Sequence, residues 1–296
     1  MAALVISGKE LAQDVLGRLK SEVASLTVAL GRKPHLAVVL VGEDPASRVY
    51  VKTKTAKALS IGMETTDVVI PGSITNESLQ AKLAGLSAER NLDGILLQLP
   101  LPNGIDELAA LRCIDPSLDV DGLHPLNQGL LLRTRNHGDE KREGFKPCTP
   151  LGVMALIDRA REELGLSKSL DGLKATVVGR SVLVGKPVAM MLVDRNCTVS
   201  LCHSKTLELD KECRQADILV AAVGRPKMIK SSWIKPHSIV IDVGINRTAE
   251  GELVGDVDFI EASEVAQAIT PVPGGVGPMT IAMLLANTVE SARRKV

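Results

Sequence analysis

Residues 174–187 read Lys174-Ala-Thr-Val-Val-Gly179-Arg180-Ser181-Val-Leu-Val-Gly185-Lys-Pro187, which describes an apolar strand, a glycine-containing turn and the start of a helix. Such a turn binds the pyrophosphate of a dinucleotide, because backbone N–H groups at the helix N-terminus point at the phosphates. The segment departs from the G-x-G-x-x-G pattern because Ser181 stands at the second glycine. An ordinary tight turn between a strand and a helix is the alternative interpretation.

The next predicted strand favours NADP over NAD. An NAD site usually has Asp or Glu at the end of this strand, where the carboxylate accepts from a ribose hydroxyl. Here the strand ends at Cys202, and His203-Ser204-Lys205 then supplies a hydroxyl and a cation but no acid. Together with Arg180 in the turn, these groups suit the 2′-phosphate of NADP. A solvated loop is the alternative for Ser204 and Lys205.

Short apolar runs alternate with helical patterns on both sides of this segment, which predicts parallel α/β structure. Apolar strands are expected at residues 35–42, 66–70, 94–100, 174–179, 197–202, 217–223 and 238–244. Helices are expected at residues 9–30, 45–60, 75–89, 150–164 and 184–195, and from Pro278 onward. Because the strands are continuously apolar, both faces of each sheet should be covered.

The bulk composition narrows the class of protein. A length of 296 residues exceeds what one hydrophobic core usually organises, so we expect two domains, with a polar connecting segment at 134–147. The 35 basic residues balance the 35 acidic ones, so no basic excess follows a nucleic-acid backbone. The five cysteines form no Cys-x-x-Cys pair and the histidines lack metal-ligand spacing. We therefore expect a soluble, cytoplasmic protein without a metal, a membrane span or a nucleic-acid partner.

Two polar features stand out in the N-terminal half. Tyr50 and Lys54 lie four residues apart, on one face of a predicted helix. Gln98 ends an otherwise apolar strand, at the edge where open α/β sheets bind ligands, and its amide needs a hydrogen-bond partner. The structural alternatives are a solvated lysine and a partner for Gln98 that serves only the fold.

Two further segments have the composition of turns. Asp119-Val-Asp121-Gly122 places two carboxylates in a turn, where they could belong to a site, and the alternative is an ordinary Asx-turn that serves only the fold. Pro271-Val-Pro273-Gly274-Gly275-Val276-Gly277-Pro278 is a loop whose glycines permit a close approach of backbone to ligand. A rigid connection between domains is the alternative for this loop.

Together these motifs resemble the methylenetetrahydrofolate dehydrogenase/cyclohydrolase family over nearly the whole chain. The matching segments are Tyr50-x-x-x-Lys54, Gln98-Leu-Pro100, Asp119-Val-Asp121-Gly122, Pro147-Cys-Thr-Pro150, Gly179-Arg-Ser181 and Pro273-Gly-Gly-Val-Gly-Pro-Met-Thr280. The last is an ungapped match of eight residues and is highly specific.

The resemblance implies two α/β domains around a cleft. The first, at residues 1–148 plus 279–296, is expected to bind folate, and the second, at 149–278, to be a Rossmann-like doubly wound parallel sheet that binds NADP. The implied activity is NADP-dependent oxidation of 5,10-methylenetetrahydrofolate to 5,10-methenyltetrahydrofolate, followed by hydrolysis to 10-formyltetrahydrofolate. The resemblance also implies a homodimer.

Residue roles follow from the resemblance, position by position. In the implied catalytic set, Lys54 performs the cyclohydrolase chemistry, Gln98 positions and tunes it, Tyr50 stacks on the folate and Asp121 binds the pterin. The implied substrate-binding residues are Tyr50, Lys54, Leu97, Gln98, Leu99, Asp121, Pro273, Gly274 and Gly277. The implied cofactor-binding residues are Gly179, Arg180, Ser181, Ser204 and Ile245, with Arg180 and Ser204 on the 2′-phosphate and Ile245 beside the nicotinamide.

Two rival functions share part of this pattern. A shikimate-type or amino-acid dehydrogenase would also place an α/β substrate domain before an NADP domain, but it would not need Gln98 to face Tyr50 and Lys54. A non-enzymatic NADP-binding regulator would keep the Gly179–Ser181 turn and would have no reason to keep Lys54.

Overall fold

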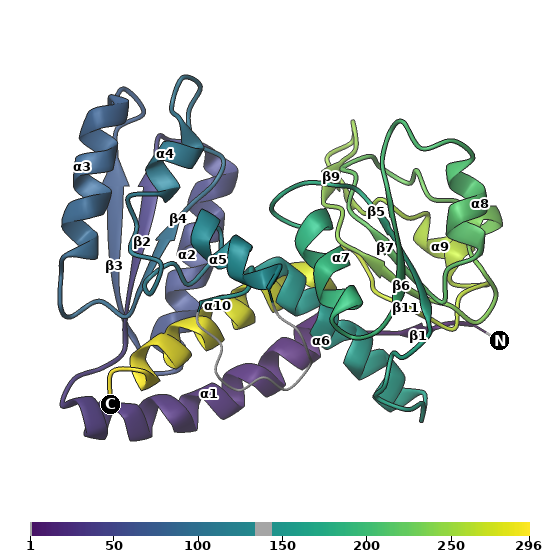
Figure 1. Cartoon of the computed structure of the whole chain (residues 1–296), viewed down its shortest axis with the longest axis horizontal. Coiled ribbons are helices and arrows are strands. Elements are labelled where there is room, and N and C mark those ends of the chain that lie inside the picture. Colours follow the sequence, from purple (N-terminus) through teal and green to yellow (C-terminus); the bar gives the residue numbers. More distant parts are fainter. Residues whose placement is uncertain (1, 134–143) are drawn as a thin grey trace. The chain divides into compact units, whose positions relative to one another are not determined.

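The computed structural model describes residues 2–133 and 144–296, and most of the expected polar segment lies outside these ranges. The chain divides into two compact units, which are described separately (Figure 1). The three-strand unit contains Asp14–Leu130, Ile281–Val296 and a short piece that ends at Cys148. The six-strand unit contains the N-terminal segment up to Gln13 and Thr149–Thr280.

The three-strand unit is built on a parallel sheet in the order β3-β2-β4. Its strands are β2 (His35–Val41), β3 (Glu64–Ile70) and β4 (Gly94–Leu97). Every residue of the central strand β2 is buried, as its continuous apolar sequence predicts. The unit also contains α2 (Pro45–Ser60), α3 (Asn76–Ser87), α4 (Glu107–Leu111) and α5 (Pro125–Leu131).

Helix α2 begins where its sequence provides a cap. The Asp44 carboxylate accepts from the backbone N–H of Ser47 at 2.7 Å, and Pro45 occupies the first turn, where its missing N–H is not needed. The helix then runs to Ser60, as predicted. The buried face of the helix contains Val51 and Lys54.

The six-strand unit is a wholly parallel sheet in the order β1-β11-β8-β7-β5-β6. Its strands are β1 (Leu4–Val5), β5 (Lys174–Val178), β6 (Thr198–Cys202), β7 (Ile218–Ala221), β8 (Ile239–Asp242) and β11 (Ala268–Ile269), and β9 (Asn246–Arg247) pairs with β10 (Leu253–Val254) outside the sheet. The unit also holds α7 (Gly185–Val193), α8 (Leu209–Arg214), the 3-10 turn η1 (Ser231–Trp233) and α9 (Phe259–Ala262). The predicted α/β class with a Rossmann-like parallel sheet is confirmed.

Three long helices are each divided between the two units, and a further boundary follows Leu130 at the end of α5. The three helices are α1 (Gly8–Leu30), α6 (Cys148–Glu163) and α10 (Val276–Arg293). Each is a continuous helix whose residues are divided between the units, at Gln13, Cys148 and Thr280.

Two features differ from the sequence expectation. Strand β1 pairs with β11, so the first residues contribute an edge strand to the six-strand unit, whereas the sequence analysis grouped them with the first domain. A two-residue strand has no periodicity, and its partner is remote in sequence. Helix α10 begins at Val276 rather than at Pro278. Pro278 is tolerated inside the first turn because the N–H groups there have no helical acceptor.

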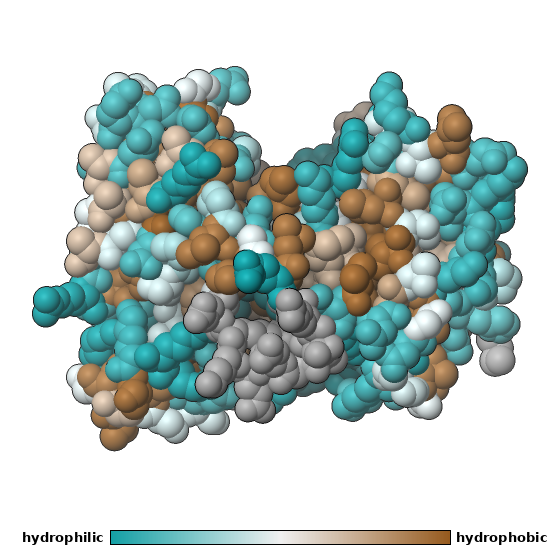
Figure 2. All heavy atoms as spheres, in the orientation of Figure 1, coloured by the Kyte–Doolittle hydropathy of each residue, from teal (hydrophilic) through white to brown (hydrophobic). Residues whose placement is uncertain are grey.

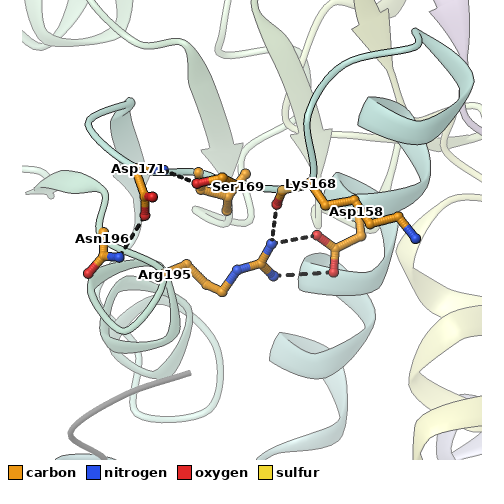
Figure 3. Close-up of a pocket in the computed structure, with 7 residues that line it drawn as sticks. Asp158, Lys168, Ser169, Asp171, Arg195 and Asn196 are labelled. Atoms are coloured by element: carbon orange, nitrogen blue, oxygen red, sulfur yellow. Dashed lines mark hydrogen bonds and ion pairs between the residues drawn. The ribbon is translucent and has the colours of Figure 1, made fainter. Parts of the chain in front are cut away.

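Arg195 holds together one end of the six-strand unit (Figure 3). Its guanidinium donates to both carboxylate oxygens of Asp158 on α6, at 2.9 and 3.2 Å, and to the carbonyl of Lys168 at 2.8 Å. Beside it, Asn196 donates to Asp171 at 2.6 Å. These groups line a pocket of about 450 Å³. Because they form hydrogen bonds with one another, we assign them a structural role.

Polar residues dominate the surface, and apolar residues form the interior. On the face drawn in Figure 2, hydrophilic residues cover most of the area and hydrophobic residues form scattered groups. Inside the six-strand unit, buried side chains of the sheet such as Val178, Leu219 and Val240 pack with Cys213 and Ile229. Among the described residues, no helix combines the length and apolarity that crossing a membrane requires.

A buried carboxylate joins the C-terminus to the three-strand sheet. Asp93, which is fully buried, accepts from two nitrogens of Arg32 at 2.6 and 2.8 Å and from the His35 N–H at 2.9 Å. The ammonium of Lys295 lies 3.0 Å from the same group. Burial by itself raises the pKa of Asp93, but the hydrogen bonds from Arg32, Lys295 and His35 outweigh it, and the pKa is lowered.

We expect Asp93→Asn to reduce the free energy of unfolding by on the order of 2 kcal/mol at pH 7, because bonds to a charged acceptor are lost. The lowered pKa of Asp93 means that this stabilisation is present above the ordinary value of 3.8 and is lost as the pH falls through the folded-state pKa. Urea unfolding at neutral and acidic pH measures both effects. Glu43→Gln, in an exposed pair with Arg48, is the matched control and should change little. Equal effects of the two substitutions would contradict this account.

Candidate active site

Helix α2 presents Tyr50 and Lys54 on one face of the three-strand unit. Lys54 is 6% exposed, and its ammonium nitrogen lies 5.7 Å from the centre of the Tyr50 ring. Tyr50 itself is 37% exposed, so one side of its ring is open to a ligand. A lysine in this position is not the solvated residue that was the alternative interpretation.

Gln98 faces Lys54 with a defined orientation of its amide. It follows β4 directly, and its backbone N–H donates to the carbonyl of Val39 at 2.8 Å. The side-chain NH2 group donates to the carbonyl of Leu99 at 2.6 Å, which leaves the amide oxygen to accept from Lys54 Nζ at 2.9 Å. The expected partner of Gln98 is therefore confirmed, and it is the lysine.

The neighbours of Gln98 differ in what they can offer a ligand. The side chain of Leu97 is only 2% exposed and belongs to the sheet core, so its backbone is the part available to a ligand. Leu99 is half-buried, and the peptide bond between Leu99 and Pro100 is cis.

The two aspartates of the Asp119–Gly122 turn differ in role, since Asp119 forms the turn and Asp121 interacts with Lys54. Asp119 is buried and accepts from the N–H of Leu123 at 3.2 Å, from the N–H of His124 at 2.7 Å and from the Asn127 amide at 2.8 Å. The turn-forming alternative therefore holds for Asp119. Asp121 is half-buried and electrostatically coupled to Lys54.

The electrostatics of this cluster move the pKa values of Lys54 and Asp121 toward each other. Burial lowers the pKa of Lys54, while the negative charge of Asp121 opposes that change. Burial raises the pKa of Asp121 to about 6, with Lys54 lowering it and Asp119 raising it. Such a convergence of pKa values is typical of groups that transfer protons in catalysis.

Cys148 and Asn287 support the Asp121 turn, although the sequence assigned neither residue a role. The buried thiol of Cys148 donates to the carbonyl of Val120 at 3.2 Å. The Asn287 amide, from α10, donates to the same carbonyl at 2.8 Å and to the carbonyl of Lys146 at 3.1 Å. An asparagine on the apolar face of a helix was the only sequence signal for this contact.

In the six-strand unit, the turn after β5 has no room for side chains. Gly179 has a φ of +124°, and a Cβ there would lie 2.1 Å from the carbonyl oxygen of Ala222. A Cβ on Gly185 would lie 1.9 Å from the carbonyl oxygen of Gly179. The two glycines thus allow the strand, the turn and the N-terminus of α7 to approach closely.

Ser181 explains the departure from the usual glycine pattern. Its hydroxyl oxygen accepts from the N–H of Val184 at 3.1 Å and from the N–H of Gly185 at 3.3 Å. The serine therefore shapes the turn and satisfies two N–H groups at the start of α7.

Arg180 and Ser204 are both exposed at the carboxyl edge of neighbouring strands. Ser204 lies in a tight turn in which the N–H of His203 donates to Thr206 Oγ1 at 2.9 Å and the N–H of Thr206 donates to the carbonyl of His203 at 2.9 Å. Within the described residues, the Arg180 guanidinium makes no hydrogen bond or ion pair. An exposed cation and a hydroxyl are therefore available to an anion.

Ile245 lies beyond β8 and is 52% exposed, so its side chain is accessible to a ligand. The buried carboxylate of Asp242, the last residue of β8, accepts from the N–H groups of Gly244 and Asp256, both at 2.9 Å. Burial raises the pKa of Asp242 to about 7, and the bonds it accepts from backbone N–H groups oppose that change.

The glycine-rich loop before α10 belongs to the six-strand unit. Gly274 has a φ of +104°, and its carbonyl accepts from the N–H of Lys9 at 3.0 Å. A Cβ on Gly8 would lie 1.8 Å from the carbonyl oxygen of Gly275, so the loop rests closely on the start of α1. Pro273, Gly274 and Gly277 thus lie in one unit, while Lys54, Gln98 and Asp121 lie in the other. In residues 2–133 and 144–296, no group of three or more His, Cys, Asp or Glu residues could hold a metal ion.

Comparison with known proteins identifies the family. The family model described as tetrahydrofolate dehydrogenase/cyclohydrolase, catalytic domain, matches residues 6–121, and the one described as its NAD(P)-binding domain matches residues 147–296. The bifunctional protein FolD of Rhodospirillum rubrum is 48% identical over 301 residues, which cover 100% of this chain and 99% of that protein.

Two solved structures extend the comparison. The bifunctional FolD methylenetetrahydrofolate dehydrogenase/cyclohydrolase of Campylobacter jejuni has a TM-score of 0.92 and 43% identity, and covers 100% of both chains. The Trypanosoma brucei methylenetetrahydrofolate dehydrogenase-cyclohydrolase, solved with NADP and an inhibitor, has a TM-score of 0.90 and 36% identity, covering 100% of this chain and 99% of that one. The chain therefore belongs to the tetrahydrofolate dehydrogenase/cyclohydrolase family.

Proposed function

We propose that the chain is a bifunctional one-carbon folate enzyme. It oxidises 5,10-methylenetetrahydrofolate to 5,10-methenyltetrahydrofolate with NADP and then hydrolyses the product to 10-formyltetrahydrofolate. The observation that carries the hydrolytic half is the buried Lys54, bonded to the neutral oxygen of Gln98 at 2.9 Å. A dehydrogenase that only moves a hydride, like a regulator that only binds NADP, has no need of such a lysine.

The residues at the carboxyl edge of the six-strand sheet fit NADP. The glycines at 179 and 185 leave the turn free of side chains, and the exposed Arg180 and Ser204 offer a cation and a hydroxyl for the 2′-phosphate. No carboxylate occupies residues 202–207, so none repels that phosphate. Bound NADP supplies the acceptor for the hydride that leaves the methylene bridge of the substrate. The NADP complex of the Trypanosoma brucei relative supports this assignment.

Lys54 manages the protons of the hydrolytic step. Water adds to the methenyl cation of the product, and Lys54 in its neutral form takes the proton that the water loses. As the bond from the carbon to the ring nitrogen breaks, the ammonium form returns this proton to the nitrogen. The added hydroxyl group loses its own proton to solvent as it becomes the formyl oxygen, so the reaction releases one proton overall. Burial lowers the pKa of Lys54, which makes the neutral form easier to reach than for an exposed lysine. Gln98 holds the amine through an uncharged acceptor, so it does not lock Lys54 in the ammonium form.

Asp121 recognises the pterin ring, and Tyr50 stacks on the folate. The pterin presents an exocyclic amino group beside a ring N–H, and an ionised carboxylate offers two acceptors to these two donors. Asp121 is held ready for this role by a turn that Cys148 and Asn287 support through the carbonyl of Val120. Pro273, Gly274 and Gly277 complete the proposed set of folate-binding residues, and Ile245 is assigned to the nicotinamide.

The domain assignment and the setting of the enzyme are also proposals. Residues 1–148 plus 279–296 form the folate-binding domain and 149–278 the NADP-binding domain, except that β1 joins the sheet of the latter. The enzyme acts as a homodimer in the cytoplasm. Family membership supports the dimer, and five free cysteines support a reducing compartment.

Lys54→Met is expected to separate the two activities. Hydride transfer depends on aligning two ligands, whereas water addition depends on a proton carrier, so hydrolysis should fall by about a hundredfold or more while part of the oxidation remains. Hydrolysis is followed as loss of methenyl absorbance from supplied 5,10-methenyltetrahydrofolate. Lys52→Met, an exposed lysine on the same helix, is the control and should change neither activity. Equal losses of both activities in folded K54M would make Lys54 a binding residue.

NADP should be preferred over NAD, with Arg180 as a main cause. The appearance of methenyl absorbance from 5,10-methylenetetrahydrofolate, with each dinucleotide in turn, tests the dehydrogenase function directly. Arg180→Ala should weaken NADP binding by about 1.5–3 kcal/mol, the range for a hydrogen bond to a charged group, and leave NAD nearly unchanged. Lys230→Ala, which removes an exposed ion pair with Asp258, is the control. Equal losses for NADP and NAD would mean that Arg180 supports the turn instead of binding the phosphate.

Folate binding should depend on the ionisation of Asp121. Because its pKa is raised to about 6, the carboxylate is mostly ionised above pH 6 and mostly protonated below it, so folate affinity should fall by about fivefold between pH 6 and pH 5. Asp121→Asn should weaken folate binding by at least roughly fivefold at pH 7.5 and abolish this dependence, with NADP affinity unchanged. Binding constants for both ligands across this pH range decide the matter. Unchanged folate affinity in D121N would remove Asp121 from the site.

A further inference from the structure

The loops after β7 and β8 lie at the same edge of the six-strand sheet as the turn after β5, because the three strands are parallel neighbours (Figure 1). Ligands of open α/β sheets bind at this carboxyl edge. Residues 223–225 follow β7, and residues 244–246 follow β8. What holds these two loops in place is therefore relevant to the cofactor.

One buried carboxylate binds both loops. Asp256, which is fully buried, accepts from three consecutive backbone N–H groups of residues 223–225, at 2.6, 3.0 and 2.8 Å. It also accepts from the side-chain amide of Asn246 at 2.9 Å. Consecutive N–H groups that converge in this way form an anion-binding concavity, and here the anion is a side chain of the protein itself.

A second carboxylate fixes the first. Asp242, at the end of β8, accepts from the N–H of Asp256 at 2.9 Å and from the N–H of Val257 at 2.8 Å. The packing around the pair leaves no room for adjustment. A Cβ on Gly244 would lie 2.3 Å from Asp256 Cγ, and a Cβ on Gly255 would lie 1.9 Å from Asp242 Oδ2.

Ile245 is the residue that these contacts place. On one side of it, the N–H of Gly244 donates to Asp242, and on the other side the Asn246 side chain donates to Asp256. The backbone of an exposed apolar residue is thus held from both sides by buried carboxylates. These contacts fix the position of Ile245, as is required of a residue that contacts the flat nicotinamide ring.

We propose that Asp256 is a positioning residue for hydride transfer. Held by Asp242, it fixes residues 223–225 and Ile245 so that the nicotinamide half of NADP is oriented toward the substrate. The inference rests on the proposed function, in which Ile245 lies beside the nicotinamide. Hydride transfer depends on the alignment of two ligands, and a displacement of about 1 Å can lower its rate by about a hundredfold.

Asp256→Asn tests the proposal with little change in shape. The amide keeps one acceptor, and its NH2 group then opposes either the N–H groups of Val223 and Gly224 or the donors of Arg225 and Asn246. We expect kcat/KM of the dehydrogenase for NADP to fall by about tenfold or more. Hydrolysis of supplied 5,10-methenyltetrahydrofolate should stay within about twofold of wild type, because Lys54 and Gln98 are untouched.

Two measurements without turnover accompany the rates. Calorimetric titration gives the Kd of NADP, and amide hydrogen exchange of the ligand-free protein reports on the N–H groups of residues 223–225, which should lose protection in D256N. Asp258→Asn is the matched control. It lies two residues away and forms an ion pair with Lys230 at 3.0 Å, so its substitution should leave both activities and the exchange unchanged.

The outcomes separate the possible failures. If D256N loses stability but keeps wild-type kcat and KM for NADP, Asp256 serves only the fold and the proposal is overturned. If D256N does not fold, Asn246→Ala decides, because it removes the contact beside Ile245 without burying an unpaired charge. That variant should lose dehydrogenase activity with hydrolysis retained, and unchanged dehydrogenase activity in it would likewise overturn the proposal. A wild-type protein that does not oxidise methylenetetrahydrofolate with NADP would count against the proposed function instead.

Discussion

The proposed chemistry depends on the desolvation of one amine. Lys54 is buried, yet its nearest hydrogen-bond partner is the neutral oxygen of Gln98 rather than a carboxylate. A carboxylate at that distance would favour the ammonium form and offset the effect of burial. Much of the three-strand unit serves this arrangement. Asp44 caps the N-terminus of α2, which carries Lys54, and Gln98 follows β4 at the edge of the sheet. The turn that contains Asp121 supplies an opposite charge that partly offsets the cost of burying the ammonium form.

In the six-strand unit, segments of the main chain pack closely against one another at the carboxyl edge of the sheet. Gly179, Gly185, Gly244 and Gly255 all stand where a Cβ would overlap a neighbouring atom. The buried carboxylates of Asp242 and Asp256 replace the sheet hydrogen bonds that end at the strand termini, and they satisfy N–H groups that would otherwise be unpaired in the interior. One unit thus tunes the proton affinity of side chains, while the other fixes the path of the main chain.

Much of this could be predicted from the sequence, for physical reasons. Strands β2, β4, β7 and β8 are buried runs of mostly apolar residues, and α2 has a cap and a proline at its start, so local rules sufficed for these elements. Strand β3 begins with four polar residues and is largely exposed, so the expectation that both faces of every strand are covered was wrong there. The contact between Gln98 and Lys54 was predictable because a polar amide at the end of a buried strand requires a partner. Strand β1 was missed because two residues carry no pattern. Cys148, Asn287 and Asp256 were missed as site residues because their partners are distant in sequence, and only Asn287, on the apolar face of a helix, carried a local signal.

Burial of the cysteines has a consequence for the survival of the protein under oxidants. Desolvation raises the pKa of Cys148, Cys197, Cys202 and Cys213, so each remains a thiol at neutral pH. Peroxides and electrophiles attack the thiolate, and these four side chains are also shielded from reagents by the fold. In the folded chain these four thiols are therefore protected from oxidation, whereas Cys113 is partly exposed. Damage at these positions would follow unfolding, and would mark molecules that have already lost their structure.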